Sequence, residues 1–258
     1  MEKVLFFGNG PLADYALKII SEKCEVIFHA RSKEDLEKIK QLKSEYPEAH
    51  GILASFGIII KPDILELFEP EGILNIHPSL LPAYRGASPI ETAILAGDND
   101  FSVSIMKLVE GMDAGPIYYQ TTLSNLPLNK TEIYQELAET GAKWLCDNLT
   151  KLPKPIPQNE KKATFCGKLD KNMSFLTPKT DTAEQTMRKI IAFQGYPKPK
   201  YTFFGKNCII LEAHTLNQGE TAPLTIPCLN NQSIAVDILQ PEGKKPIDAK
   251  SFLNGYKK

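Results

Sequence analysis

The chain lacks several features that would place it in well-defined classes of protein. None of its apolar runs approaches the roughly 20 residues that a membrane span requires. It contains no CxxC pair and no GxxxxGKS or GxxxxGKT loop, and no histidine stands at metal-ligand spacing from any of the five cysteines. These absences argue against a membrane protein, a structural zinc site and a P-loop nucleotidase.

The composition is that of an ordinary globular protein. Of the 258 residues, 42% are hydrophobic and 24% are charged, which suffices for one large domain and one small one. The first apolar run spans only about five residues and predicts a buried first strand, not a signal peptide. The cysteines are odd in number and widely scattered, so we expect a cytoplasmic protein with reduced thiols and no metal.

Charge is distributed unevenly along the chain, although the net charge is only −1. Residues 1–150 carry 13 Lys and Arg against 22 Asp and Glu, whereas residues 151–258 carry 17 against 9. An acidic first part and a basic second part indicate that the second part meets an anionic partner. A solvated, lysine-rich surface is the alternative.

The first part alternates apolar runs with amphipathic segments, a pattern typical of an α/β fold with a doubly wound, mostly parallel, Rossmann-like sheet. Residues 51–60 form the longest apolar run and predict a buried parallel strand. The expected strands are 3–7, 25–29, 51–60, 72–76, 101–108 and 117–122, and the expected helices are 12–20, 32–46, 63–68, 89–96 and 131–149.

A proline-rich stretch at residues 152–157 marks a change in texture. Beyond it, short strands are joined by polar turns, which predicts a small β-rich, OB-like domain of the kind that binds nucleic acid. We therefore expect a catalytic domain over residues 1–155, an extended linker over 156–180 and a basic domain over 181–258.

Polar residues follow two of the predicted strands. Asn75 and His77 end one strand, and Asp113 stands in a glycine-containing loop after another. In a doubly wound sheet, ligands bind outside the carboxyl ends of parallel strands, so we expect the three side chains to share that edge. An amide, an imidazole and a carboxylate are the groups needed to stabilise an oxyanion and move a proton. A buried turn with a hydrogen-bonded histidine is the alternative for His77.

The segment Gly8-Asn9-Gly10-Pro11-Leu12-Ala13 matches the GxGxxA dinucleotide fingerprint between a strand and a helix. An NADP-linked oxidoreductase is therefore a second hypothesis. Pro11 removes one amide from the phosphate cradle, however, and this function leaves Asn75, His77 and Asp113 unexplained. An ordinary tight turn between strand and helix fits better.

The sequence NIHPSLLPAYRGASPI at 75–90, followed by GMDAGPI at 111–117, resembles the formyltransferase family that uses 10-formyltetrahydrofolate. Within it, the chain is most similar to members that formylate methionyl-tRNA. The segments ATFCGKL at 163–169, IAFQGYP at 191–197 and LQPEGKKPIDAKSFL at 239–253 extend the resemblance into the second part. Relatives that act on tRNA carry a basic loop after the second strand, whereas residues 31–50 here are mixed in charge.

This resemblance implies formyl transfer to the α-amine of initiator methionyl-tRNA, without a membrane, metal or protein partner. It implies that Asn75, His77 and Asp113 are catalytic. An amino-sugar N-formyltransferase with the same trio, and an RNA-binding module without activity, are the alternatives. The folate contacts implied are Phe56, Gly57, Ile58, Ile59, Ile60 and Ser79, and the tRNA contacts predicted are Arg85, Lys198, Lys200, Lys206, Lys244 and Lys245.

Overall fold

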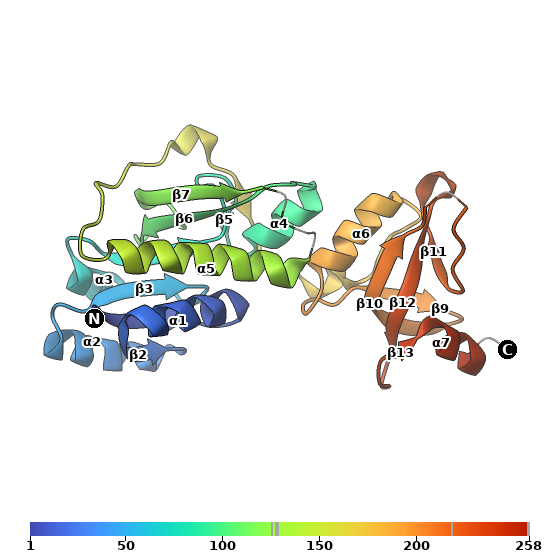
Figure 1. The fold of residues 1–258 in the computed structure, drawn as a ribbon, viewed down its shortest axis with the longest axis horizontal. Coiled ribbons are helices and arrows are strands. Elements are labelled where there is room, and N and C mark those ends of the chain that lie inside the picture. Colours follow the sequence, from blue (N-terminus) through green and yellow to red (C-terminus); the bar gives the residue numbers. More distant parts are fainter. Residues whose placement is uncertain (125, 127–128, 218, 257–258) are drawn as a thin grey trace. The chain divides into compact units, whose positions relative to one another are not determined.

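A mixed six-stranded sheet organises residues 1–90 and 99–167, which form the first of two units in the computed structural model (Figure 1). Residues 91–98 and 168–258 form the second unit. The structure describes residues 1–124, 126, 129–217 and 219–256. Within this described part, no helix combines the length and the apolar character needed to cross a membrane.

The sheet of unit 1 is mostly parallel, as the sequence predicts. Strands β1 to β4 pair in parallel, whereas β6 is antiparallel to β4 and β7 is antiparallel to β6. The strand order is β2 (Glu25–Ala30), β1 (Lys3–Gly8), β3 (His50–Ala54), β4 (Ile73–His77), β6 (Phe101–Lys107) and β7 (Ile117–Leu123).

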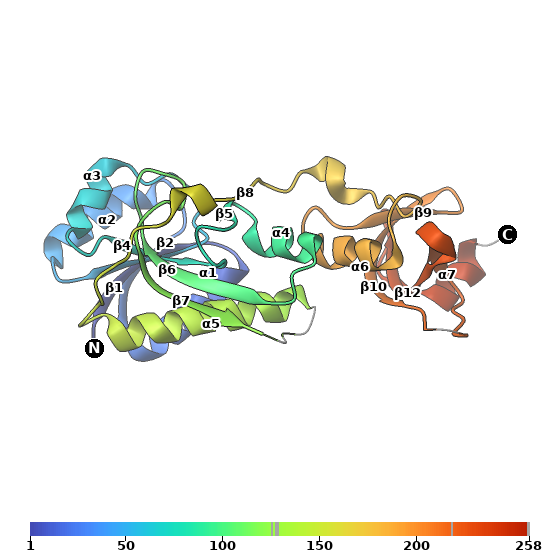
Figure 2. The same cartoon turned by 90° about the horizontal axis from the view of Figure 1, so that it is seen from above.

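Helices cover both faces of this sheet (Figure 2). On one face, α5 (Lys130–Asn148) packs beside α1 (Pro11–Lys23) and approaches the strands closely at Gly141. A Cβ there would lie 2.8 Å from a side-chain carbon of Ile76. On the other face, apolar residues of α2 (Asp35–Glu45) and α3 (Pro62–Leu65) pack in one cluster with Leu5, Leu53 and Ile73. Residues of β4 therefore alternate between two covered faces.

Two local predictions differ from the structure. The apolar run 51–60 is a strand only to Ala54, and residues 55–61 form a loop. The expected linker 156–180 is divided between the units. Ile156 exchanges two backbone hydrogen bonds of 2.8 Å with Ile117 of β7, and β8 (Phe165–Cys166) pairs with β5 (Arg85–Gly86), so this half belongs to unit 1. Residues 168–180 belong to unit 2.

Unit 2 is β-rich, as predicted. Its antiparallel sheet has the order β11 (Thr225–Pro227), β12 (Ser233–Pro241), β10 (Lys206–Thr215) and β9 (Lys200–Phe203), with β13 (Ile247–Asp248) added beside β12. Helices α6 (Ala183–Ala192) and α7 (Ala249–Tyr256) contribute to its apolar core. A capping box between Thr182 and Gln185 satisfies the first backbone amides of α6.

The helical segments of the two units not yet named are α4 (Pro89–Ala96), η1 (Glu66–Phe68), η2 (Glu160–Lys162), η3 (Lys171–Ser174) and η4 (Leu229–Asn231).

His214 on β10 lies between two carboxylates, and this arrangement makes the stability of unit 2 depend on pH. Its Nδ1 is 2.8 Å from Asp237 and its Nε2 is 3.2 Å from Glu220. The hydrogen bond with Asp237, followed by that with Glu220, raises the pKa of His214. Because the pKa of His214 is higher in the folded state, the protonated imidazole stabilises the fold fully below the unfolded-state pKa of about 6.5. This contribution is lost as pH rises through the folded-state pKa.

We expect His214→Gln to lower the unfolding midpoint at pH 6 and to leave it unchanged at pH 9. Because 45% of the side chain is exposed, the loss at pH 6 should be below about 1 kcal/mol. Thermal melts of wild type and variant at the two pH values measure the difference. An equal loss at both values would show that the ion pairs contribute nothing.

Candidate active site

Asn75 and His77 stand at the carboxyl end of β4 and are both only 4% exposed. They are two residues apart on a strand, so both point to the face opposite Ile76 and α5. Within the described part of the chain, no protein group hydrogen-bonds the side-chain amide of Asn75. Every fully buried polar side-chain atom among these residues has a hydrogen-bond partner, so the unpaired amide of Asn75 must be partly accessible to solvent. The amide is therefore available to a ligand.

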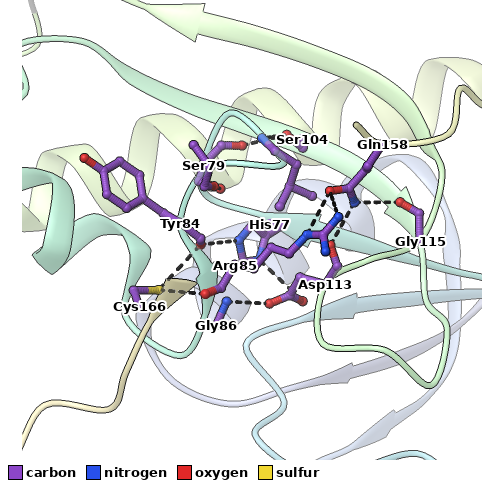
Figure 3. Close-up of polar contacts among 12 residues, drawn as sticks. His77, Ser79, Tyr84, Arg85, Gly86, Ser104, Asp113, Gly115, Gln158 and Cys166 are labelled. Atoms are coloured by element: carbon purple, nitrogen blue, oxygen red, sulfur yellow. Dashed lines mark hydrogen bonds and ion pairs between the residues drawn. The ribbon is translucent and has the colours of Figure 1, made fainter. Parts of the chain in front are cut away.

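The imidazole of His77 is anchored at one nitrogen and faces a carboxylate at the other (Figure 3). Nε2 lies 3.1 Å from the carbonyl oxygen of Tyr84. A carbonyl can only accept, so Nε2 carries a proton. Nδ1 lies 3.7 Å from Oδ1 of Asp113. A proton on Nδ1 would thus place a positive charge opposite the Asp113 carboxylate.

Asp113 reaches this place by a route that the sequence analysis did not foresee. We expected it to follow a strand parallel to β4, but β6 is antiparallel, with Leu74 opposite Lys107 and His77 opposite Ser104. The carboxyl end of β6 therefore lies beside the beginning of β4. The loop between β6 and β7 carries Asp113 back to His77, where the backbone amide of Gly86 donates to Oδ2 at 2.8 Å. The predicted proximity is observed, but its predicted cause is wrong.

Arg85 is a correction to the predicted tRNA contacts. Its side chain is 3% exposed, and its guanidinium is hydrogen-bonded inside unit 1. It donates to both carboxylate oxygens of Glu160, at 2.8 and 2.7 Å, and to the amide oxygen of Gln158. A buried and paired guanidinium cannot also neutralise a tRNA phosphate. Glu160 raises the pKa of Arg85 through this hydrogen bond.

Ser79, an implied folate contact, is also engaged within the protein. It is buried, and its hydroxyl donates to the carbonyl of Ala83 at 2.7 Å. Ser104 on β6 donates to the carbonyl of Ser79 and accepts from the amide of Leu81. Together these bonds hold the turn after His77 in shape (Figure 3). The hydroxyl proton of Ser79 is thus used within the protein, and a folate contact at Ser79 stays a prediction.

The strip implied to bind folate, residues 56–60, begins near Asn75 and His77. Leu53 of β3 pairs in parallel with Asn75, so the loop after Ala54 leaves the sheet at the edge where His77 ends β4. Phe56 and Ile60 point into the core, and Ile58 packs against it. Gly57 and Ile59 form the side of the strip that is turned to solvent. Gly57 has a φ of 69° and nothing within 4 Å of where a Cβ would lie, and Ile59 is 89% exposed.

The five remaining lysines belong to unit 2 and are exposed, apart from a half-buried Lys200. The amide of Glu242 donates to the carbonyl of Asn207, so the turn that carries Lys244 and Lys245 lies beside the start of β10 at Lys206. Lys200 lies with its Nζ 5.8 Å from the centre of the Phe175 ring. Lys198 precedes β9.

The dinucleotide-like turn has a structural explanation. A Cβ at Gly8 would lie 2.3 Å from the carbonyl oxygen of Ala54 and 2.7 Å from Cβ of Ala13. Gly10 has a φ of 81°, which favours glycine, and Pro11 then starts α1. The packing of β1 against β3 and α1 therefore accounts for Gly8, and the positive φ accounts for Gly10, whether or not a phosphate binds.

Metal ligation finds no support in the geometry. Within the described residues, no group of three or more His, Cys, Asp or Glu side chains is placed to hold an ion. Metal-free chemistry therefore stays a prediction of the sequence analysis.

The chain belongs to the formyl transferase family. The family model described as "Formyl transferase" matches residues 10–149, and the model "Formyl transferase, C-terminal domain" matches residues 168–257. A methionyl-tRNA formyltransferase of Wolbachia pipientis subsp. Culex pipiens is 35% identical over 247 residues, which cover 93% of this chain and 81% of the relative.

Solved structures show the same fold. Methionyl-tRNA formyltransferase from Clostridium thermocellum superposes with a TM-score of 0.69 at 21% identity, over 93% of this chain and 98% of that one. HypX from Aquifex aeolicus, solved in complex with tetrahydrofolic acid, gives a TM-score of 0.74 at 17% identity, over 100% of this chain and 48% of that one. The predicted α/β domain followed by a β-rich domain is thus confirmed.

Proposed function

We propose that this protein transfers a formyl group from 10-formyltetrahydrofolate to the α-amino group of methionine on initiator tRNA, in the cytoplasm. One observation carries the proposal. Asp113 lies 3.7 Å from His77 at the end of β4, where Asn75 shares the same face, in a chain with a methionyl-tRNA formyltransferase relative at 35% identity.

The three side chains divide the chemistry of acyl transfer. The neutral amine attacks the formyl carbon, and negative charge develops on the formyl oxygen. The Asn75 amide and an N–H at Nδ1 of His77 donate to that oxygen, each worth about 3 kcal/mol in comparable sites. Asp113 lies opposite Nδ1 and accepts the proton that the amine loses. That proton passes to N10 of the folate as the carbon–nitrogen bond breaks, which leaves a formamide and tetrahydrofolate.

The residues present fit a folate donor. A flat ring system needs an apolar wall and backbone that it can approach closely, and Ile59 and Gly57 supply these beside His77. We therefore assign the exposed side of the strip 56–60 to the folate, with Phe56 and Ile60 as its support in the core.

Ile59→Asp should weaken tetrahydrofolate binding by roughly 10- to 100-fold, because the loss of one buried Ile contact costs roughly 1.5–3 kcal/mol. The side chain is 89% exposed, so the melting temperature should not change. Anaerobic calorimetric titration measures the affinity. Leu67→Asp is the control, since Leu67 is also exposed but follows α3 in η1. Equal affinities of the Ile59 variant and wild type would remove Ile59 from the folate site.

The basic second half supplies the tRNA contact in this proposal. Lys206, Lys244 and Lys245 lie on adjacent turns, where their charges can act on neighbouring phosphates. Neutralising phosphates releases counterions, so the affinity for tRNA should fall steeply as salt rises.

The double variant Lys244→Glu/Lys245→Glu should raise KM for methionyl-tRNA by at least tenfold and leave folate affinity unchanged, because two attractive charges become repulsive. Steady-state formylation at two salt concentrations measures both effects. Lys18→Glu/Lys151→Glu makes the same change of charge at two exposed positions of unit 1. If both double variants give the same KM, the lysines of unit 2 are only a solvated surface.

The test of the proposal is formyl transfer itself. With isotopically labelled 10-formyltetrahydrofolate and methionyl-tRNA, labelled formylmethionine should be recovered after mild alkaline release from the tRNA. Label that stays with the folate would reject the proposed reaction.

A further inference from the structure

The segment that follows the prolines is tied to unit 1 at both ends. Its first tie is the pair of backbone hydrogen bonds between Ile156 and Ile117, and its last is the pairing of β8 with β5. We call residues 156–166 the strap. Gln158 lies on the strap between these two ties, and the sequence analysis assigned it no role.

Gln158 holds the backbone of the loop that carries Asp113. Its side-chain Nε2 donates to the carbonyl oxygen of Asp113 at 2.8 Å and to that of Gly115 at 2.7 Å (Figure 3). Asp113 has a φ of 45°, a conformation uncommon for a residue with a side chain. Two hydrogen bonds from the Gln158 amide therefore hold the carbonyls of Asp113 and Gly115 at a point where the backbone conformation is unfavourable.

Arg85 orients the Gln158 amide. Its Nε and Nη2 both donate to Oε1 of Gln158, at 3.0 and 2.7 Å, so the amide oxygen must face Arg85 and the amide nitrogen must face the loop. The same guanidinium binds Glu160 of the strap. The next residue, Gly86, donates its backbone amide to Oδ2 of Asp113. Both the backbone and the carboxylate of Asp113 are thus held from the Arg85–Gly86 strand.

We propose that Gln158 is a positioning residue, oriented by Arg85, which holds the Asp113 carboxylate against Nδ1 of His77. The inference rests on the proposed function for its effect on catalysis, but its structural half does not depend on that function. A displacement of about 1 Å at a reacting group is enough to cost on the order of 10²-fold in rate.

Gln158→Glu tests this inference sharply. Glutamate has nearly the same size and pairs well with Arg85, but its oxygens cannot donate to the carbonyls of Asp113 and Gly115. We expect kcat to fall between about 10- and 100-fold, with KM for both substrates within twofold of wild type. Hydrogen exchange at the Gly86 amide should accelerate, because its acceptor is no longer held.

Glu160→Gln is the matched control on the same strap. The Glu160 side chain is 67% exposed, and glutamine still accepts from Arg85, so kcat and Gly86 exchange should stay within twofold of wild type. Arg85→Lys should reproduce the loss seen with Gln158→Glu, because lysine lacks the planar fork that binds Gln158 and Glu160 together. Melting temperatures accompany each variant.

The outcomes separate this inference from the proposed function. If wild type transfers formyl groups and Gln158→Glu matches it in kcat and Gly86 exchange, the positioning role is wrong. The role is also overturned if Gln158→Glu lowers kcat and the melting temperature together, while hydrogen exchange at the Gly86 amide stays unchanged below the unfolding transition. If wild type transfers no formyl group, the proposed function fails, and faster exchange in Gln158→Glu still supports the role of Gln158.

Discussion

Asp113→Asn should lose at least about 10²-fold in the rate of formyl transfer and keep the fold. Asparagine has the same shape and can still accept the hydrogen bond that the Gly86 amide donates at 2.8 Å. It cannot accept the proton of the attacking amine, and it removes the negative charge that lies 3.7 Å from Nδ1 of His77. Single-turnover measurements with saturating substrates report this step directly.

A melting temperature and tetrahydrofolate affinity near those of wild type would show that the loss is chemical. A rate within a few-fold of wild type would remove Asp113 from the reaction. His77→Ala should lose a comparable factor, because it deletes the group that Asp113 faces.

Asn75→Ala should lower kcat by about 10²–10³-fold, the range observed when one oxyanion donor is removed. The amide is the least committed polar group of the site, since no described protein group hydrogen-bonds it. Its role is therefore expected to appear only when charge develops on the formyl oxygen. KM for both substrates should change little.

Asn75→Asp is the companion variant, because it keeps the size of the side chain and replaces the donor by a negative charge. It should lose at least as much activity as Asn75→Ala. A milder effect of Asp than of Ala would indicate that Asn75 fills space and does not donate to an oxyanion.

Much of unit 1 is predictable from local sequence. Alternating apolar runs and amphipathic segments predict the α/β sheet, because burial on one or two faces imposes these periods. The turn at Gly8 to Pro11 is equally local, since a positive φ and a close backbone approach both require glycine. The pair Asn75 and His77 follows from strand alternation alone.

Long-range features of the site were not predictable in this way. Nothing in residues 101–107 reveals that β6 is antiparallel to β4, because strand direction is set by the preceding connection. The apolar run to Ile60 hides the end of β3, because Phe56 and Ile60 in the following loop are core residues as well.

Residues 156–166, the strap, were predicted to be part of a linker, because the sequence does not show that they pair with unit 1. Proline-rich sequence indicates an extended segment but does not indicate what that segment lies against. Arg85 and Gln158 are more than 70 residues apart in the sequence. Their hydrogen bonds form only because the strap returns to pair with β5. A buried arginine and an exposed one have the same signature in sequence.

The central claim is that this trio acts on methionyl-tRNA, and a comparison of acceptors tests it most directly. With 10-formyltetrahydrofolate as the donor, kcat/KM is measured for initiator methionyl-tRNA and for a panel of nucleotide-linked amino sugars, with Asp113→Asn as the blank. We predict efficient formylation of methionyl-tRNA and no turnover of the sugars above the blank. Efficient formylation of an amino sugar, with methionyl-tRNA at the level of the blank, would contradict the account.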